Sequence, residues 1–173
     1  VAPLLAMQPA YDKADQALAL ARRKDLAGAQ KLAAEAARLA PKEARFPQLQ
    51  GDIALAQKNP QAALAYYQKS IVLDDSYFAS HLGAGTAQYQ LRTGDRGEAE
   101  LTRSAKLLPT APALYYLGSI AKEAGNRQRA MELFKGAAGS KSELGKQAAA
   151  EYARMDFAEN GTKYLASGLQ ADS

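Results

Sequence analysis

The chain has 173 residues, of which 47% are hydrophobic, with 22 basic and 18 acidic residues and a formal net charge of +4. This hydrophobic content is enough for one core-bearing domain or a short array of repeats. Charges of both signs are interspersed, which is typical of solvated helix faces and argues against a nucleic-acid-binding surface. The absence of cysteine excludes disulfides and thiolate metal sites. No run of 18 apolar residues is present, so we expect no direct membrane insertion.

Small residues and aromatic residues recur at fixed gaps along the chain. Starting from Gly118, two small residues and one aromatic residue follow at gaps of 12, 16 and 19, namely Ala130, Phe134 and Ala137. The same gaps recur upstream, in the sets Gly51, Ala63, Tyr67, Ser70 and Ala17, Ala29, Ala33, Ala36. A third copy, with looser spacing, lies around Ala87 and Ala99. The sets repeat with a period of about 34 residues, as from Ala17 to Gly51, and such a repeat predicts a solenoid of stacked helix pairs.

Helical periodicity predicts the elements in chain order. A lead segment at residues 1–9 contains two prolines, and helices are then expected at about 10–23, 26–40, 46–57, 60–73 and 77–92. A sixth helix starts after a cap at Asp95 and ends before Pro109. A helix–turn–helix at 112–137 and a last helix at 142–156 complete the series.

Helix-capping residues give a second measure of the period. Asp25, Asn59, Asp95 and Asn126 are well placed as N-caps. The second interval between successive caps is slightly longer than the first, and the third is shorter. These intervals predict an insertion near Ser76 and a shortening near Ser104.

The pattern L-G…G-x-x-x-x-A…F-x-x-A resembles the tetratricopeptide (TPR) repeat. It is formed by Leu117, Gly118, Gly125, Ala130, Phe134 and Ala137. The resemblance implies an all-α fold, an α-solenoid of about four helix hairpins plus a C-terminal capping helix. The expected division is a lead segment at 1–9, a repeat array at 10–140, a capping helix at 141–158 and a C-terminal extension at 159–173. Within the array the repeats are expected at about 10–43, 44–77, 78–110 and 111–140.

Residue types that carry catalysis or bind metals are scarce. With a single histidine, His81, the chain holds no HExxH pair and no His-rich metal site, and it has no nucleotide-binding loop or nucleophile elbow. We therefore expect no catalytic residue, no metal ligand and no cofactor in this chain. We interpret Asp74-Asp75 as a turn and cap, and Asn160-Gly161-Thr162 as a helix C-cap although it matches a glycosylation sequon.

In TPR proteins the first helices of the repeats line a groove that receives peptides or protein segments. The resemblance therefore implies groove positions at Tyr11, Arg22, Gln48, Asp52, His81, Gln88, Arg92, Tyr115, Ser119 and Lys122. Plain solvent exposure is the alternative for each of them, and for His81 we favour a surface or groove-lining role over catalysis. The tyrosine pairs 66–67 and 115–116 are interpreted as one core and one exposed ring each. Chaperone-binding TPR proteins hold a C-terminal carboxylate with a Lys and Asn clamp, whereas the first-repeat equivalents here are Ala14 and Leu18, so a chaperone-tail receptor is not expected.

Several longer phrases resemble the C-terminal TPR region of bacterial envelope zinc metalloproteases, the BepA-like group with an HExxH domain. They are QPAYDKADQALALARRKDLAGA, PKEARFPQLQGDIALAQK, LLPTAPALYYLG and KYLAS. The resemblance implies an upstream protease domain that carries the zinc, and a periplasmic or envelope location, although a cytoplasmic one stays open. It also implies that the array recruits substrates or covers the cleft of its own protease domain, with outer-membrane proteins among its partners. Because the chain begins at Val1, we expect a piece of a larger protein.

Three classes of function follow: the recognition region of such a protease, a stand-alone adaptor or scaffold, and an enzyme in its own right. We favour the first, in which protein or peptide segments are the ligands. The shortage of catalytic residue types argues against the third.

Overall fold

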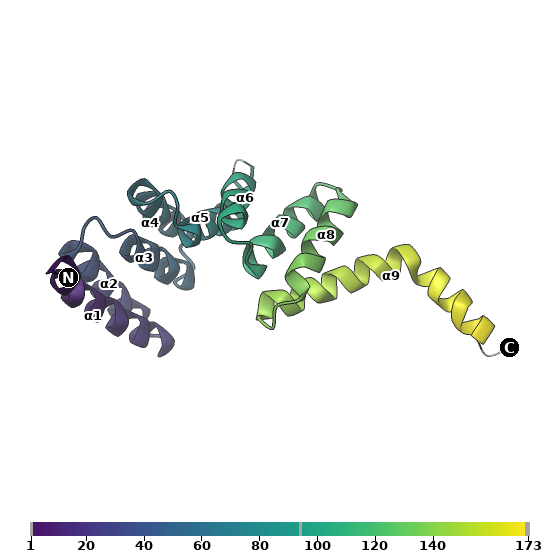
Figure 1. Cartoon of the computed structure of the whole chain (residues 1–173), viewed down its shortest axis with the longest axis horizontal. Coiled ribbons are helices and arrows are strands. Elements are labelled where there is room, and N and C mark those ends of the chain that lie inside the picture. Colours follow the sequence, from purple (N-terminus) through teal and green to yellow (C-terminus); the bar gives the residue numbers. More distant parts are fainter. Residues whose placement is uncertain (1, 94, 172–173) are drawn as a thin grey trace. The chain divides into compact units, whose positions relative to one another are not determined.

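The computed structural model describes the backbone of residues 2–93 and 95–171 and the side chains of residues 5–93 and 95–164. In these ranges all the regular secondary structure is helical, which confirms the all-α prediction (Figure 1). The helices are α1 (Ala2–Arg22), α2 (Leu26–Leu39), α3 (Arg45–Ala56), α4 (Pro60–Leu73), α5 (Phe78–Leu91), α6 (Glu98–Leu107), α7 (Ala111–Glu123), α8 (Arg127–Ala138) and α9 (Glu143–Ala171). The chain forms two compact units, Val1–Leu108 and Pro109–Ser173.

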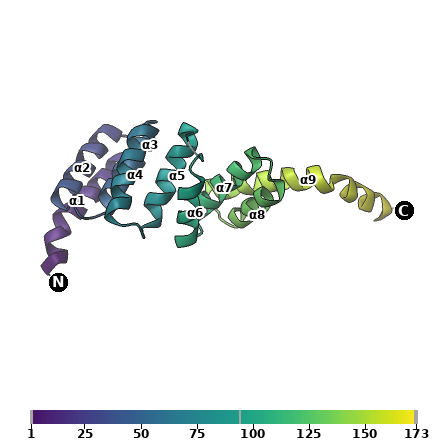
Figure 2. The ribbon, with the colours of Figure 1, turned by 90° about the horizontal axis from the view of Figure 1, so that it is seen from above.

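Unit 1 consists of three helix hairpins, α1–α2, α3–α4 and α5–α6. Each hairpin packs on the next through α2 against α3 and α4 against α5. Figure 2 shows these helices side by side along the unit. Asp25 and Asn59 cap α2 and α4 as predicted, because their side chains accept from the amides of Gly28 and Ala62.

A single aromatic ring explains the small residues of the second hairpin. Tyr67 of α4 is fully buried, and its ring lies against Gly51 of α3 and Gly83 of α5. A Cβ atom at Gly51 would lie 2.6 Å from a ring carbon, closer than real Cβ contacts allow. Only glycine lets both neighbouring helices approach the ring.

The third hairpin is offset from the second by the same number of residues as the second is from the first. The looser copy that was expected at Ala87 and Ala99 is therefore wrong. Its set is Gly85, Gly97, Leu101 and Ser104, and a Cβ at Gly85 would lie 2.6 Å from Leu101 Cγ. The Ser70 hydroxyl donates to the carbonyl oxygen of Ala44 at 2.6 Å, and the Ser104 hydroxyl donates to that of Phe78 at 3.0 Å. Both bonds tie a second helix to the start of the first, across the same sequence separation.

The predicted insertion near Ser76 is therefore wrong. Asp95 accepts from the amides of Gly97 and Ala99, but it does so in a turn that precedes α6. Gly97 occupies the left-handed region with φ of +84°, so α6 starts later than α2 and α4 do relative to their buried small residues. The capping residue therefore lies at a different position in the third hairpin than in the first two, whereas the buried residues keep the constant offset between repeats.

Unit 2 contains the α7–α8 hairpin and α9. Phe134 of α8 is buried against Gly118 of α7, where a Cβ would lie 2.8 Å from the ring. Asn126 caps α8 by accepting from the amide of Arg129, and α9 packs against both α8 and α7.

Both terminal helices are longer than expected. α1 begins at Ala2, within the lead segment, and carries Pro9 inside it. Pro9 removes one helical hydrogen bond, but Met7 and Ala10 pack into the core of unit 1, which outweighs that cost. α9 runs past Asp156 to Ala171, so the expected C-cap at Asn160-Gly161 is wrong. There the Asn160 amide donates to Asp156 Oδ1 at 2.9 Å, and the Phe157 ring covers Gly161.

Candidate binding surface

In unit 1 the first helices of the three hairpins are α1, α3 and α5. The constant offset between repeats defines which of their residues are equivalent. Relative to the buried residues Ala17, Gly51 and Gly85, equivalent positions form three-membered rows across α1, α3 and α5. The rows are Tyr11, Arg45, Ala79; Ala14, Gln48, Leu82; Leu18, Asp52, Thr86; and Ala21, Leu55, Tyr89. This set is called the first-helix surface below.

Asp52 lies at the centre of the first-helix surface and joins three segments of the chain. Its Oδ1 accepts a hydrogen bond of 2.6 Å from the Tyr67 hydroxyl, and its Oδ2 accepts from the Gln48 amide. Gln48 Oε1 in turn accepts from the Tyr77 hydroxyl at 3.2 Å. Within the described residues Asp52 forms no ion pair, so its negative charge faces the surface without a cation.

The protein environment shifts the pKa of both members of the central pair. Partial exclusion of water raises the pKa of the Asp52 carboxyl, and the hydrogen bonds from Tyr67 and Gln48 offset only part of this rise. Burial raises the pKa of the Tyr67 phenol, and the neighbouring Asp52 charge raises it further. The phenol therefore stays protonated and keeps donating to the carboxylate.

A second polar cluster lies beside Asp52. Of its residues, only Tyr11 was predicted from the sequence as a groove position. The Tyr11 hydroxyl donates to Glu43 Oε2 at 2.8 Å, and Arg45 Nε lies 3.4 Å from Glu43 Oε1. The Arg45 guanidinium also lies over the Tyr11 ring, 5.6 Å from its centroid. A cavity of about 470 Å³ opens here, lined by Glu43, Ala44, Arg45, Asp74 and Tyr77. Arg45 lies one full repeat after Tyr11, a signal that could have revealed it.

The structure brings together three of the predicted groove residues, Tyr11, Gln48 and Asp52. Arg22 is exposed at the end of α1. Gln88 is half-buried and lies two residues after Thr86 of the first-helix rows. Arg92 is the left-handed C-cap of α5 and lies beyond those rows.

His81 is not the surface residue that the sequence analysis expected. Its exposed fraction is 3%, Nδ1 lies 2.6 Å from Glu100 Oε2 of α6, and Nε2 lies 2.9 Å from the carbonyl oxygen of Asp75. Arg103 of α6 also reaches Asp75, with Nη2 2.8 Å from Oδ2. His81 therefore joins α5 to α6 inside the hairpin and does not line a groove.

The three remaining predicted residues belong to unit 2 and take part in its packing. Tyr115 packs against Phe134 with ring centroids 5.9 Å apart, and the Ser119 hydroxyl donates to the Tyr115 carbonyl oxygen at 3.0 Å. Lys122 Nζ pairs with Glu151 Oε2 of α9 at 2.6 Å. Tyr115 and Lys122 thus hold unit 2 together.

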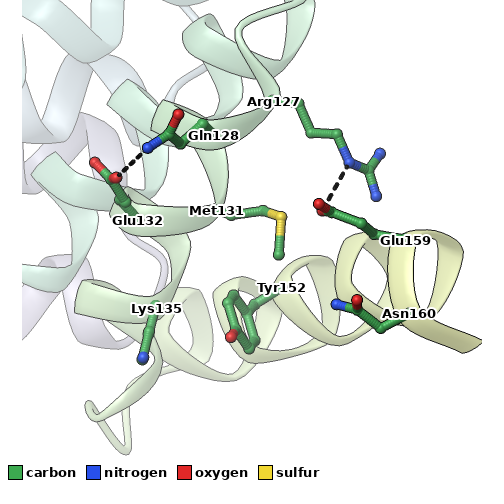
Figure 3. Close-up of a pocket in the computed structure, with 8 residues that line it drawn as sticks. All are labelled: Arg127, Gln128, Met131, Glu132, Lys135, Tyr152, Glu159 and Asn160. Atoms are coloured by element: carbon green, nitrogen blue, oxygen red, sulfur yellow. Dashed lines mark hydrogen bonds and ion pairs between the residues drawn. The ribbon is translucent and has the colours of Figure 1, made fainter. Parts of the chain in front are cut away.

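Unit 2 has a cavity of its own between α8 and α9, with a volume of about 510 Å³ (Figure 3). Met131 and Tyr152 contribute its apolar surface, and the Arg127–Glu159 pair, 3.5 Å apart, lies at one end. The remaining lining residues are Gln128, Glu132, Lys135 and Asn160. Sequence reasoning did not predict this cavity because it depends on α9 continuing as one helix.

The described residues hold neither a metal-binding cluster nor a membrane-spanning helix. Among the described residues no three His, Cys, Asp or Glu side chains are grouped so as to hold a metal ion. None of the described helices is both long and apolar enough to cross a bilayer.

Comparisons with known proteins identify the fold. No protein-family model matches the sequence, and no curated protein is significantly similar to it. Among solved structures, yeast Tom70 is 19% identical with a TM-score of 0.75, over 93% of this chain and 36% of that protein. MamA is 17% identical with a TM-score of 0.68, over 91% and 95% of the two chains. The first TPR domain of Spaghetti (RPAP3), solved with an HSP90 peptide, is 16% identical with a TM-score of 0.65, over 68% and 94%. The chain therefore has the helical-hairpin fold of tetratricopeptide-repeat proteins.

Proposed function

We propose that this chain is a protein-interaction module and that the first-helix surface of unit 1 binds a segment of a partner protein. The observation that carries this proposal is the exposed Asp52 carboxylate among the first-helix side chains, which forms no ion pair within the described residues. The RPAP3 structure supports it by analogy, because that TPR domain of the same fold was solved with a bound peptide.

The charge of the surface favours a basic ligand. Asp52 lacks a cationic partner among the described residues, and the adjacent cavity adds two carboxylates, Glu43 and Asp74, against the single cation Arg45. These charges oppose the net charge of +4 of the whole chain. The positions of the Lys and Asn clamp hold Ala14, which is buried, and Leu18, which is 39% exposed. A segment that places a Lys or Arg beside Asp52 and an apolar side chain beside Leu18 fits this surface best.

Selection of peptides from a random display library on the purified chain tests this proposal. We expect the selected peptides to be enriched in Lys and Arg and to bind Asp52→Asn about two- to fivefold more weakly than the native chain, as for a partly exposed ion pair. Gln61→Lys on α4 is the matched control, since it also raises the net charge by one, and it should leave affinity unchanged. Peptides without basic residues, or equal binding to both variants, would contradict the assignment.

We further propose that the module serves as the substrate-recruiting or regulatory region of a periplasmic zinc metalloprotease, whose zinc lies in an upstream domain. The sequence phrases shared with the BepA-like group support this role, with outer-membrane proteins and the protease domain itself as partners. An antibody raised to this chain should then detect an envelope polypeptide much larger than 18.4 kDa that contains zinc. A soluble band near 18.4 kDa would favour a stand-alone adaptor instead.

A further inference from the structure

α9 occupies the place of the first helix of a fifth hairpin. It contacts α8 and α7 in the way that α5 contacts α4 and α3 in unit 1. After α5 the chain turns back, and α6 covers α5 by placing Leu101 against Gly85 and Glu100 against His81. α9 instead continues to Ala171 as one helix, so within the described residues no second helix covers it.

The end of α9 nevertheless carries the spacing of a second helix. Starting from Ala149, the gaps found in the other hairpins recur at Gly161, Leu165 and Gly168. The third hairpin has similar residue types at these gaps, in the set Gly85, Gly97, Leu101 and Ser104. The step from Gly118 to Ala149 is shorter than the full repeat, and α8 is correspondingly short. It ends one residue after Ala137, whereas α4 and α6 end three residues after Ser70 and Ser104.

A turn sequence lies between the two halves of α9. Asn160-Gly161 is a strong turn-forming dipeptide, and both residues lower the stability of a helix interior relative to alanine. Gly161 also matches Gly97, the left-handed residue at which the chain enters α6. Figure 1 shows that α9 changes direction along its length.

α8 contacts α9 a few residues before this turn sequence. The Arg127 guanidinium donates to the carbonyl oxygen of Met155. It also pairs with Glu159, as Figure 3 shows. The apolar surface nearby is incompletely covered: Met131 and Tyr152 line the open cavity, and Phe157 is 62% exposed.

We propose that α9 has a second conformation in which it breaks at Asn160–Gly161 and residues 162–171 fold back as the second helix of a fifth hairpin. The folded-back segment covers the N-terminal half of α9 as α6 covers α5. In the continuous conformation, Asn160 and Tyr164 donate to the two carboxyl oxygens of Asp156 at 2.9 Å each. The bond from Tyr164 crosses the turn and breaks when the helix does. The inference concerns unit 2 and is independent of the binding proposed for unit 1.

Distance measurement by electron paramagnetic resonance tests the proposal directly, because the chain contains no cysteine that would compete for spin labels. Labels at Glu143→Cys and Gln170→Cys are about 40 Å apart along a continuous helix, given a rise of about 1.5 Å per residue. In a closed hairpin the same labels are less than about 20 Å apart, since packed helices lie about 10 Å from each other. We expect both distances in the doubly labelled chain.

Matched variants connect the short distance to the turn. Asn160→Ala combined with Gly161→Ala should reduce the short-distance fraction at least about fivefold, because both changes favour a continuous helix. Gly136→Ala on the exposed side of α8 also raises helix propensity and should leave the fraction unchanged. A long distance alone in the native chain would overturn the proposal. A short distance that also arises when two singly labelled samples are mixed would overturn it too, because the covering segment would then come from a second copy.

Discussion

Asp52 and Tyr67 form a coupled pair at the centre of the first-helix surface. The phenol is fully buried, and Asp52 Oδ1 accepts from its hydroxyl at 2.6 Å. Because the pKa of Asp52 is raised in the folded protein, the folded state binds a proton there more tightly than the unfolded chain does. Ionisation of Asp52 therefore reduces the free energy of unfolding as the pH rises above the ordinary value of 3.8 and through the folded-state pKa.

We expect Asp52→Asn to remove this pH dependence while keeping an oxygen acceptor for Tyr67. The stability of Asp52→Asn relative to the native chain should therefore increase as the pH rises from 3.8 toward neutrality, as measured by urea unfolding at a series of pH values. Asp52→Ala leaves the buried Tyr67 hydroxyl without this acceptor and should lower the free energy of unfolding by about 1–3 kcal/mol. A relative loss of stability in Asp52→Asn with rising pH would show that the native carboxylate stabilises the fold.

Hairpin packing in both units is governed by steric contacts between a small residue and a ring or a branched side chain. Gly83 belongs to this set although it lies outside the repeated spacing, because the Tyr67 ring extends from Gly51 to Gly83. We expect Gly83→Ala to overpack this contact and to lower the free energy of unfolding by about 1–3 kcal/mol. The control is Gly139→Ala, where no neighbouring atom lies within 4 Å of the new Cβ, and its thermal midpoint should not fall. Equal midpoints for the two variants would contradict the role of the ring.

The sequence spacing predicts a hairpin well where a large aromatic ring packs against a small residue of the facing helix. The pairs Gly51 with Tyr67 and Gly118 with Phe134 can be recognised in the sequence, because only glycine leaves room for the ring. The third hairpin was misplaced by two residues, since Leu101 is less distinctive and the capping residue Asp95 lies in a displaced turn. His81 was expected at the surface or in a groove, whereas it is buried.

The binding surface was only partly predictable for a related reason. Tyr11, Gln48 and Asp52 occupy periodic positions on first helices, so the repeat identifies them. Glu43 and Tyr77 precede helices and reach the surface through hydrogen bonds with Tyr11 and Gln48. They lie one full repeat apart, but their residue types differ, so the spacing alone does not identify them. The ends of α1 and α9 depend on tertiary packing and on side-chain hydrogen bonds, which local turn and proline signals do not report.

At the scale of the whole molecule, a chain of hairpins gains its stability from nearest-neighbour contacts. Each hairpin of unit 1 is stabilised by the next, through α2 with α3 and α4 with α5, and unit 2 has its own core around Phe134. Local opening in such arrays is confined to the hairpins whose contacts are weakened. The two compact units should therefore respond separately to damage in either core.

Gly118→Ala provides the test, because its new Cβ would lie 2.8 Å from the Phe134 ring at the centre of unit 2. We expect faster amide hydrogen exchange in α7, α8 and the N-terminal half of α9, while α1 to α4 keep their native protection. Gly83→Ala should give the reverse pattern, with faster exchange in α3 to α6, because the Tyr67 ring packs against both α3 and α5. The pair of variants controls for a general loss of stability, since each serves as the reference for the other. A uniform increase across all the helices in both variants would mean that the chain unfolds as one cooperative unit, and the units would then be divisions of structure without separate stability.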